Sequence, residues 1–147
     1  MITLHTIGFT KKTAEQFFEL LRKHGVKRIV DVRLNNTSQL ASFAKMPDLQ
    51  YFLDKICAIG YEAVPDFAPT KELLSDYQHK KIDWLGYERV FRQLLEKRRV
   101  ADKYKAEQFD GCCLLCSEDT PEHCHRRLVA EYLRQNSAED VRILHLK

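Results

Sequence analysis

Short apolar stretches alternate with amphipathic ones along the chain, and this alternation constrains the fold more than any other feature. Extended apolar runs are expected at residues 1–8, 28–33, 61–64, 112–117 and 141–145. Between them, apolar side chains recur at helical spacing, most clearly in Leu128, Val129, Tyr132 and Leu133. Strands that alternate with helices favour a mainly parallel sheet. We therefore predict an α/β fold in three layers, with a mainly parallel sheet of about five strands and helices on both faces.

Length and composition fit an ordinary globular protein. A chain of 147 residues can bury a core without disulfide or metal staples, so we predict that residues 1–147 form a single domain. No apolar run approaches the roughly 20 residues that cross a bilayer, so we expect no membrane partner. Five cysteines without a preceding secretory signal favour reduced thiols, and we expect a cytoplasmic protein. The oligomeric state stays open.

Capping signals predict where the helices begin and end. Thr10 follows the first strand and is expected to cap a helix that runs from Lys11 to a glycine stop at Gly25. The remaining helical segments are expected from Pro47 to about residue 60, partly over 70–81, over 86–109, and from Pro121 to about residue 135.

Ligands of an open parallel sheet collect beyond the carboxyl ends of its strands, where loops and helix N-termini gather polar groups. This rule selects residues from three separate strand ends, namely Gly8 and Thr10, then Asp31 and Arg33, then Cys116, Ser117 and Glu118. We expect these segments to meet at one edge of the sheet.

Cys124 is the candidate nucleophile. It is expected in the opening turns of the last long helix, where the positive end of the helix dipole favours a thiolate and lowers the thiol pKa. His125 and Arg126 follow it directly. The alternative is a structural cysteine, because Cys124 lies four residues before Leu128 on the core-facing stripe and free cysteine often packs as a small hydrophobe.

Thiols and imidazoles are numerous enough here to suggest zinc. Residues three apart on a strand point to opposite faces, so Cys113 and Cys116 cannot hold one ion on an unbroken strand. Cys116, Cys124 and one histidine remain an alternative ligand set. Because such thiols are often simply buried, we predict no metal, and we predict no cofactor.

Arg126 stands beside a helix N-terminus, and the fork of a guanidinium suits phosphate or carboxylate. Arg33 can add a second positive group from the neighbouring strand end. The alternative is a buried ion pair between one of these arginines and Asp31 or Glu118. Those two carboxylates are also candidates for an acid and base pair.

Three motifs resemble those of a domain-of-unknown-function family, the one numbered 488. They are Thr6-Ile7-Gly8-Phe9-Thr10, then Asp31-Val32-Arg33 with Ser38 a few residues on, and Leu114-Leu115-Cys116-Ser117-Glu118 leading to Cys124-His125-Arg126. The resemblance runs over essentially the whole chain. It implies a compact α/β domain of bacteria or archaea whose three motifs line a shared pocket, and it implies no particular reaction. Family members often carry histidine or tyrosine where this chain has Phe9, which argues against a catalytic side chain there.

Two hypotheses of function follow. The preferred one is a pocket for a small anionic ligand, bearing phosphate or carboxylate and including nucleotides, with Arg33 and Arg126 as anion anchors. If the pocket is enzymatic, Cys124 is the nucleophile and Glu118 or Asp31 the acid or base. The alternative is a nucleic-acid-associated binding module that uses the same arginines and the basic stretch 97–105 without catalysis. A net charge of +3 permits either hypothesis.

Overall fold

The sheet has five strands, all parallel, in the order β3-β2-β4-β1-β5. We analysed a computed structural model that describes residues 1–37 and 42–147. The strands are β1 (Ile2–Gly8), β2 (Arg28–Asp31), β3 (Gly60–Ala63), β4 (Cys113–Cys116) and β5 (Val141–Leu146). The predicted α/β class with a parallel sheet is confirmed.

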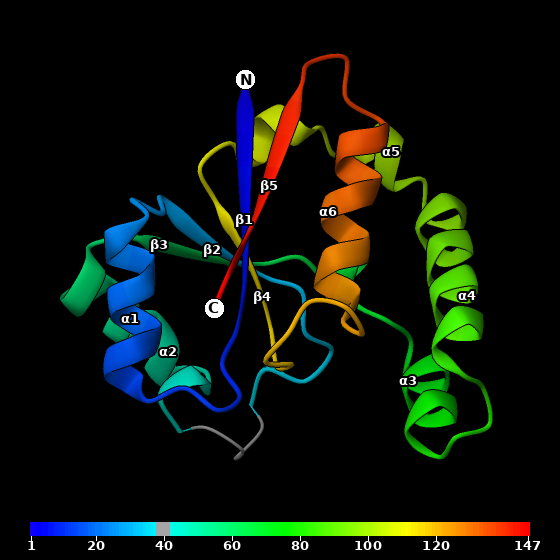
Figure 1. Cartoon of the computed structure of the whole chain (residues 1–147), viewed down its shortest axis with the longest axis horizontal. Coiled ribbons are helices and arrows are strands. Elements are labelled where there is room, and N and C mark those ends of the chain that lie inside the picture. The colour runs from blue at the N-terminus through cyan, green and yellow to red at the C-terminus, as the bar shows by residue number, and fades with distance from the viewer. Residues whose placement is uncertain (38–41) are drawn as a thin grey trace.

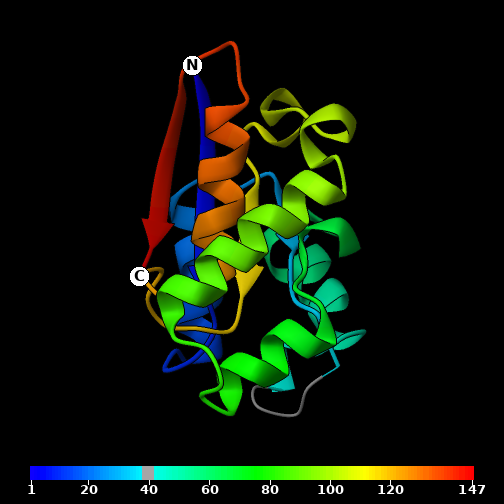
Figure 2. The same ribbon diagram turned by 90° about the vertical axis from the view of Figure 1, so that its right-hand side faces the viewer.

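Helices cover both faces of the sheet (Figure 1). One face carries α1 (Ala14–Lys23) and α2 (Asp48–Phe52), which continues as a π-helical turn over Leu53–Cys57. The other face carries α6 (His125–Gln135), and α4 (Trp84–Lys97) packs outside it (Figure 2). The remaining elements are α3 (Lys71–Gln78), α5 (Val100–Lys103) and short 3₁₀ turns at Ser42–Ala44, Pro65–Phe67 and Ala106–Phe109.

The core is divided into two apolar clusters by the sheet. Side chains alternate along β4, so Leu114 and Cys116 join the cluster beneath α4 and α6, whereas Cys113 and Leu115 join the cluster beneath α1 and α2. Strands buried on both faces read as continuous apolar runs, which is why the sequence marks them clearly. The predicted separation of Cys113 from Cys116 follows from the same alternation.

The first helix begins later than predicted. Thr13, not Thr10, is the N-cap of α1: its hydroxyl accepts a hydrogen bond from the Gln16 backbone, and the Gln16 side chain accepts one from the Thr13 backbone. This reciprocal capping box fixes the start of the helix. Thr10 is exposed, and its backbone N–H donates instead to the Ser117 carbonyl over 3.0 Å. The predicted stop at Gly25 is confirmed by its left-handed conformation, with φ of 62°.

Two other helix predictions need correction. The region 86–109 is not one helix, because α4 ends at Lys97 and Arg99 adopts a left-handed conformation with φ of 58° before the short α5. The last helix begins at His125 rather than Pro121, since residues 117–124 form a loop. Cys124 is therefore the N-cap of α6 and lies outside its first turn.

Among the described residues, no helix has both the length and the apolar composition needed to cross a membrane.

Candidate functional site

The strand order brings three predicted segments to one edge of the sheet. β4 lies between β1 and β2, and its last residues pair with Gly8 and Asp31, which end those two strands. The loop 117–124 then leaves this edge and leads into the N-terminus of α6. The ends of β1, β2 and β4 therefore meet beside the start of a helix.

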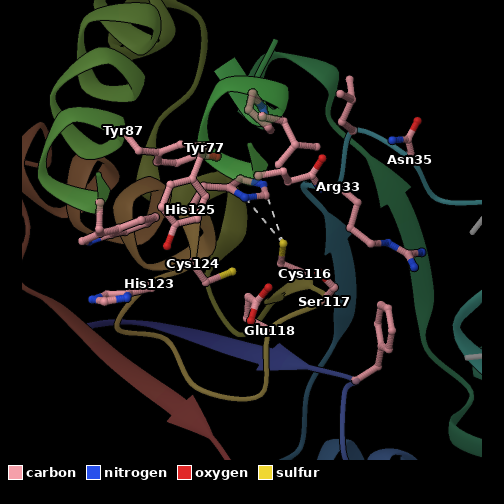
Figure 3. A pocket seen from close by; sticks show the side chains of 16 residues that line it. Arg33, Asn35, Tyr77, Tyr87, Cys116, Ser117, Glu118, His123, Cys124 and His125 are labelled. Atoms are coloured by element: carbon pink, nitrogen blue, oxygen red, sulfur yellow. Dashed lines mark hydrogen bonds between the residues drawn. The ribbon is translucent and has the colours of Figure 1, made fainter. Parts of the chain in front are cut away.

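A cavity of about 230 Å³ opens at this edge, between the strand ends and the helices α3 and α4 (Figure 3). Its wall combines polar groups from the strand ends with aromatic groups from the helices. The lining residues are Phe9, Arg33, Leu34, Asn35, Pro69, Leu74, Tyr77, Gln78, Trp84, Tyr87, Cys116, Ser117, Glu118, His123, Cys124 and His125.

Two thiols and an imidazole lie together in this cavity (Figure 3). The sulfur of Cys116 is 3.5 Å from Nδ1 of His125. The Nε2 atom of His125 lies 2.6 Å from the backbone carbonyl oxygen of Val32. Because a carbonyl oxygen only accepts hydrogen bonds, Nε2 carries a proton and donates it. In the neutral imidazole, Nδ1 then carries no proton, and the Cys116 sulfur lies beside both ring nitrogens, 3.8 Å from Nε2.

The thiols of Cys116 and Cys124 differ in pKa. The sequence predicted a lowered pKa for Cys124, but the structure lowers that of Cys116 instead. A hydrogen bond from Cys124 lowers the pKa of Cys116, with support from the Ser117 backbone and the charge of Arg126, although burial opposes the shift. Burial, and then the bond and charge of Cys116, raise the pKa of Cys124. The expected low pKa of Cys124 is therefore wrong, because its buried side chain acts as the donor of the pair.

Arg126 is a buried cation without a carboxylate partner among the described residues. Its Nη1 donates to the backbone carbonyl of Glu118 over 2.6 Å, and its Nε donates to the Thr6 hydroxyl over 3.3 Å. Its Nη2 is buried and has no hydrogen-bond partner in the described part of the chain. Arg126 does not line the cavity, so its positive charge lies behind the wall.

Gly8 allows the loop after β4 to approach β1. A Cβ atom built on Gly8 would overlap the carbonyl oxygen of Glu118, lie 2.6 Å from its carbonyl carbon, and lie 3.0 Å from Nη1 of Arg126. No side chain fits there, so glycine is needed for close approach. Gly8 positions Glu118 and does not line the cavity itself.

Asp31 and Arg33 form a buried bidentate ion pair. The sequence had offered such a pair as the alternative to anion binding by Arg33. The Nε and Nη2 atoms of Arg33 each donate to a different oxygen of Asp31 over 2.9 Å. The hydroxyl of Tyr61 donates to the same carboxylate over 2.5 Å, and burial together with this bond raises the tyrosine pKa. Asp31 does not line the cavity; it holds Arg33, whose guanidinium lies over the ring of Phe9.

An aromatic wall stands opposite the strand ends. The ring of Trp84 stacks on Tyr87 at 5.0 Å and on His123 at 5.1 Å, while Tyr77 meets it edge-on at 5.6 Å. Sequence reasoning gave Tyr77 no role in the site. The recurrence of aromatic residues at 77, 84 and 87 was the available signal.

The other predicted site residues are distributed as follows. Ser117 and Glu118 line the cavity, and the exposed Glu118 side chain has no ion-pair partner among the described residues (Figure 3). Thr10 is exposed and lies outside the lining. Ser38 lies outside the described residues.

The basic stretch 97–105 does not form one free cationic face. Arg98 donates to the carbonyl oxygens of Asp66 and Ala68, which lie in the preceding loop. Three other cations of the stretch bind nearby groups as well: Arg99 pairs with Asp102, Lys103 with Asp66, and Lys105 donates to the Ala101 carbonyl. Lys97 is exposed and has no such partner among the described residues. These bonds give no support to the nucleic-acid alternative.

Comparison with known proteins finds one family. The family model described as "Domain of unknown function DUF488" matches residues 13–133, which include β2, β4, the loop 117–124 and most of α6. No curated protein and no solved structure matches the chain.

Proposed function

The chain belongs to the DUF488 family, whose description states no reaction, and we propose that its cavity binds a small anionic ligand of the nucleotide type. The observation that carries this proposal is the pairing of positive groups at the strand ends with an aromatic wall across the same cavity. A phosphate or carboxylate suits the first side, and a planar ring system suits the second.

Positive charge comes from three sources. Arg33 lines the cavity, and its Nη1 forms no hydrogen bond with any described residue, so this atom is free to donate to an anion. The helix α6 opens beside the cavity without a side-chain cap, which leaves its first N–H groups available. Arg126 adds a buried cation behind the wall. Since Asp31 is committed to Arg33, Glu118 is the one carboxylate that faces these groups among the described lining residues.

Size and shape restrict the ligand. A volume of about 230 Å³ lies below the range of about 300 to 1,000 Å³ that is typical of pockets for drug-sized ligands. A ligand no larger than a mononucleotide is therefore expected. Stacking of a base on an aromatic side chain contributes about 1–3 kcal/mol, and the cavity lining includes the aromatic rings of Tyr77, Trp84 and His123.

Of the three residues predicted to be catalytic, Glu118 is the one that the geometry still supports as acid or base. Asp31 is held by Arg33 and Tyr61, and burial raises the pKa of Cys124. We therefore propose ligand binding with Glu118 as the candidate proton-transfer group, and we assign no nucleophile.

Calorimetric titration with AMP, adenosine and inorganic phosphate tests the proposal. AMP is expected to bind at one site, and Arg33→Met is expected to weaken AMP binding at least about tenfold, because a charge-assisted bond of about 1.5–3 kcal/mol is lost. Adenosine lacks the anion and should be insensitive to that change.

The matched control is Arg22→Met, which removes an exposed cation of α1 that pairs with Glu19 far from the cavity. This variant should bind AMP as the wild type does. AMP affinity that is equal in the wild type and in Arg33→Met, or an absence of binding by every anion in the series, would refute the proposal.

A further inference from the structure

Cys116, Cys124 and His125 bring three metal-binding atoms to one point. Their sulfur and ring nitrogen atoms all lie within 4.8 Å of one another, and all three side chains are buried. The residues come from two elements, since Cys116 ends β4 while Cys124 and His125 open α6. We propose that they form a three-ligand site for zinc, with the fourth coordination position facing the cavity.

The separation of Cys116 and His125 fits tetrahedral coordination. Zinc bonds of about 2.3 Å to sulfur and 2.0–2.1 Å to nitrogen, set at the tetrahedral angle, place the sulfur about 3.5 Å from the nitrogen. The sulfur of Cys116 lies 3.5 Å from Nδ1 of His125. The separation of this pair therefore suits a shared zinc ion once the imidazole turns its Nδ1 toward it.

The histidine is held in the tautomer that a metal requires. Nε2 donates to the Val32 carbonyl, which leaves Nδ1 without a proton in the neutral ring and therefore able to bind a metal. The Cys116 sulfur lies 3.5 Å from Nδ1 and 3.8 Å from Nε2, so the ring must turn to aim the Nδ1 lone pair at an ion bound by this sulfur. Metal-binding histidines commonly donate their second ring nitrogen to a backbone carbonyl, which fixes the ring and the tautomer. Val32 is itself fixed, because its N–H donates to the Leu115 carbonyl of β4. The sheet thus fixes the tautomer of the imidazole.

Ligand type and number determine the kind of site. Thiolates and imidazole favour zinc over magnesium or calcium, which prefer oxygen. Two thiolates balance the charge of a divalent ion, so the occupied site would place no net charge in the buried wall. Three protein ligands leave one position open, as in catalytic zinc centres. All three ligand residues line the cavity, so the open position is reachable by a ligand within it.

This proposal is independent of the anionic ligand, because it concerns side chains of the chain alone. If both proposals hold, the metal offers an additional anchor for an anionic oxygen. Metal binding is therefore measured without AMP or phosphate, so that either proposal can fail while the other stands.

The test uses the full chain, reduced and stripped of metal, with zinc and cobalt(II) as probes. The wild type is expected to bind one equivalent of zinc by elemental analysis. Cobalt should give the intense visible bands of tetrahedral coordination together with thiolate-to-cobalt charge transfer. Cys116→Ser, Cys124→Ser and His125→Gln should each weaken zinc binding at least about a hundredfold, since each removes a direct ligand.

Cys113→Ser is the matched control, because Cys113 belongs to the same strand, is equally buried, and faces the other side of the sheet. It should keep one equivalent of zinc, and circular dichroism should show that every variant is folded. If a ligand variant does not fold, the cobalt spectrum of the wild type decides alone. Cobalt without charge-transfer bands, zinc far below one equivalent, or unchanged zinc affinity in folded Cys116→Ser would overturn the proposal.

Discussion

Substitution of Gly8 by alanine tests whether the loop after β4 is held against β1. The new Cβ would occupy the position of the Glu118 carbonyl oxygen, so the loop must move away. Overpacking of a core costs about 1–3 kcal/mol, and loss of the bond from Arg126 to that carbonyl adds about 1.5–3 kcal/mol. We expect Gly8→Ala to lower the free energy of unfolding by about 3–5 kcal/mol.

Urea unfolding followed by circular dichroism measures this effect. With a slope of about 2 kcal/mol per molar urea, the midpoint should fall by about 1.5–2.5 M. Gly60→Ala is the control, because its Cβ would meet only the side chain of Arg28, at 3.5 Å or beyond. That variant should change stability by less than about 1 kcal/mol. Equal midpoints for the two variants would refute the assigned role of Gly8.

The other predictions concern single contacts and are measured by the same unfolding assay. Asp31→Asn leaves the Arg33 guanidinium buried and uncompensated, so stability should fall by about 3–5 kcal/mol; a loss below about 1 kcal/mol would contradict the buried ion pair. Thr13→Ala should cost about 1 kcal/mol through loss of the capping box, whereas Thr10→Ala should be nearly neutral, and the reverse ranking would restore Thr10 as the cap. Burial lowers the pKa of His5 below its unfolded value of about 6.5, so its contribution is fully present above about pH 6.5 and is lost as pH falls through the folded-state pKa. The fall in stability between pH 7 and pH 5 should therefore be smaller in His5→Gln than in the wild type, and an identical slope would show that His5 does not titrate in this way.

The architecture could be predicted because its signals are local. Each strand is an apolar run, and each long helix has an apolar stripe, so the observed strands end within a few residues of the predicted ones. Errors arose where two local signals competed. Thr10 follows the first strand directly, yet Thr13 and Gln16 form the capping box. Pro121 resembles a first helical residue, yet α6 begins only after Cys124.

The candidate site could be predicted only in part, because it depends on which elements become neighbours. The insertion of β4 between β1 and β2 sets Gly8 beside Cys116, and no local pattern specifies that order. The aromatic wall depends on α3 and α4 packing near the strand ends. Sequence spacing therefore could not predict that Tyr77 lines the cavity.

Helix phase explains the two adjacent arginines at the start of α6. Arg126 faces the sheet and donates to Thr6, whereas Arg127 faces outward and pairs with Glu88 and Glu131. The sequence places both beside a helix N-terminus and cannot separate their roles until the first residue of α6 is known. The sequence suggested that Arg126 lies inside the cavity. In the structure it is buried behind the cavity wall.

The most direct test of the proposed function is the fluorescence of Trp84 during titration with AMP. Trp84 is the single tryptophan of the chain and lines the cavity, so its emission reports on this site alone. A ligand ring that stacks in the cavity should change the emission saturably, with the same dissociation constant as calorimetry gives. Calorimetric binding of AMP with unchanged Trp84 emission would place the ligand elsewhere and contradict the proposal.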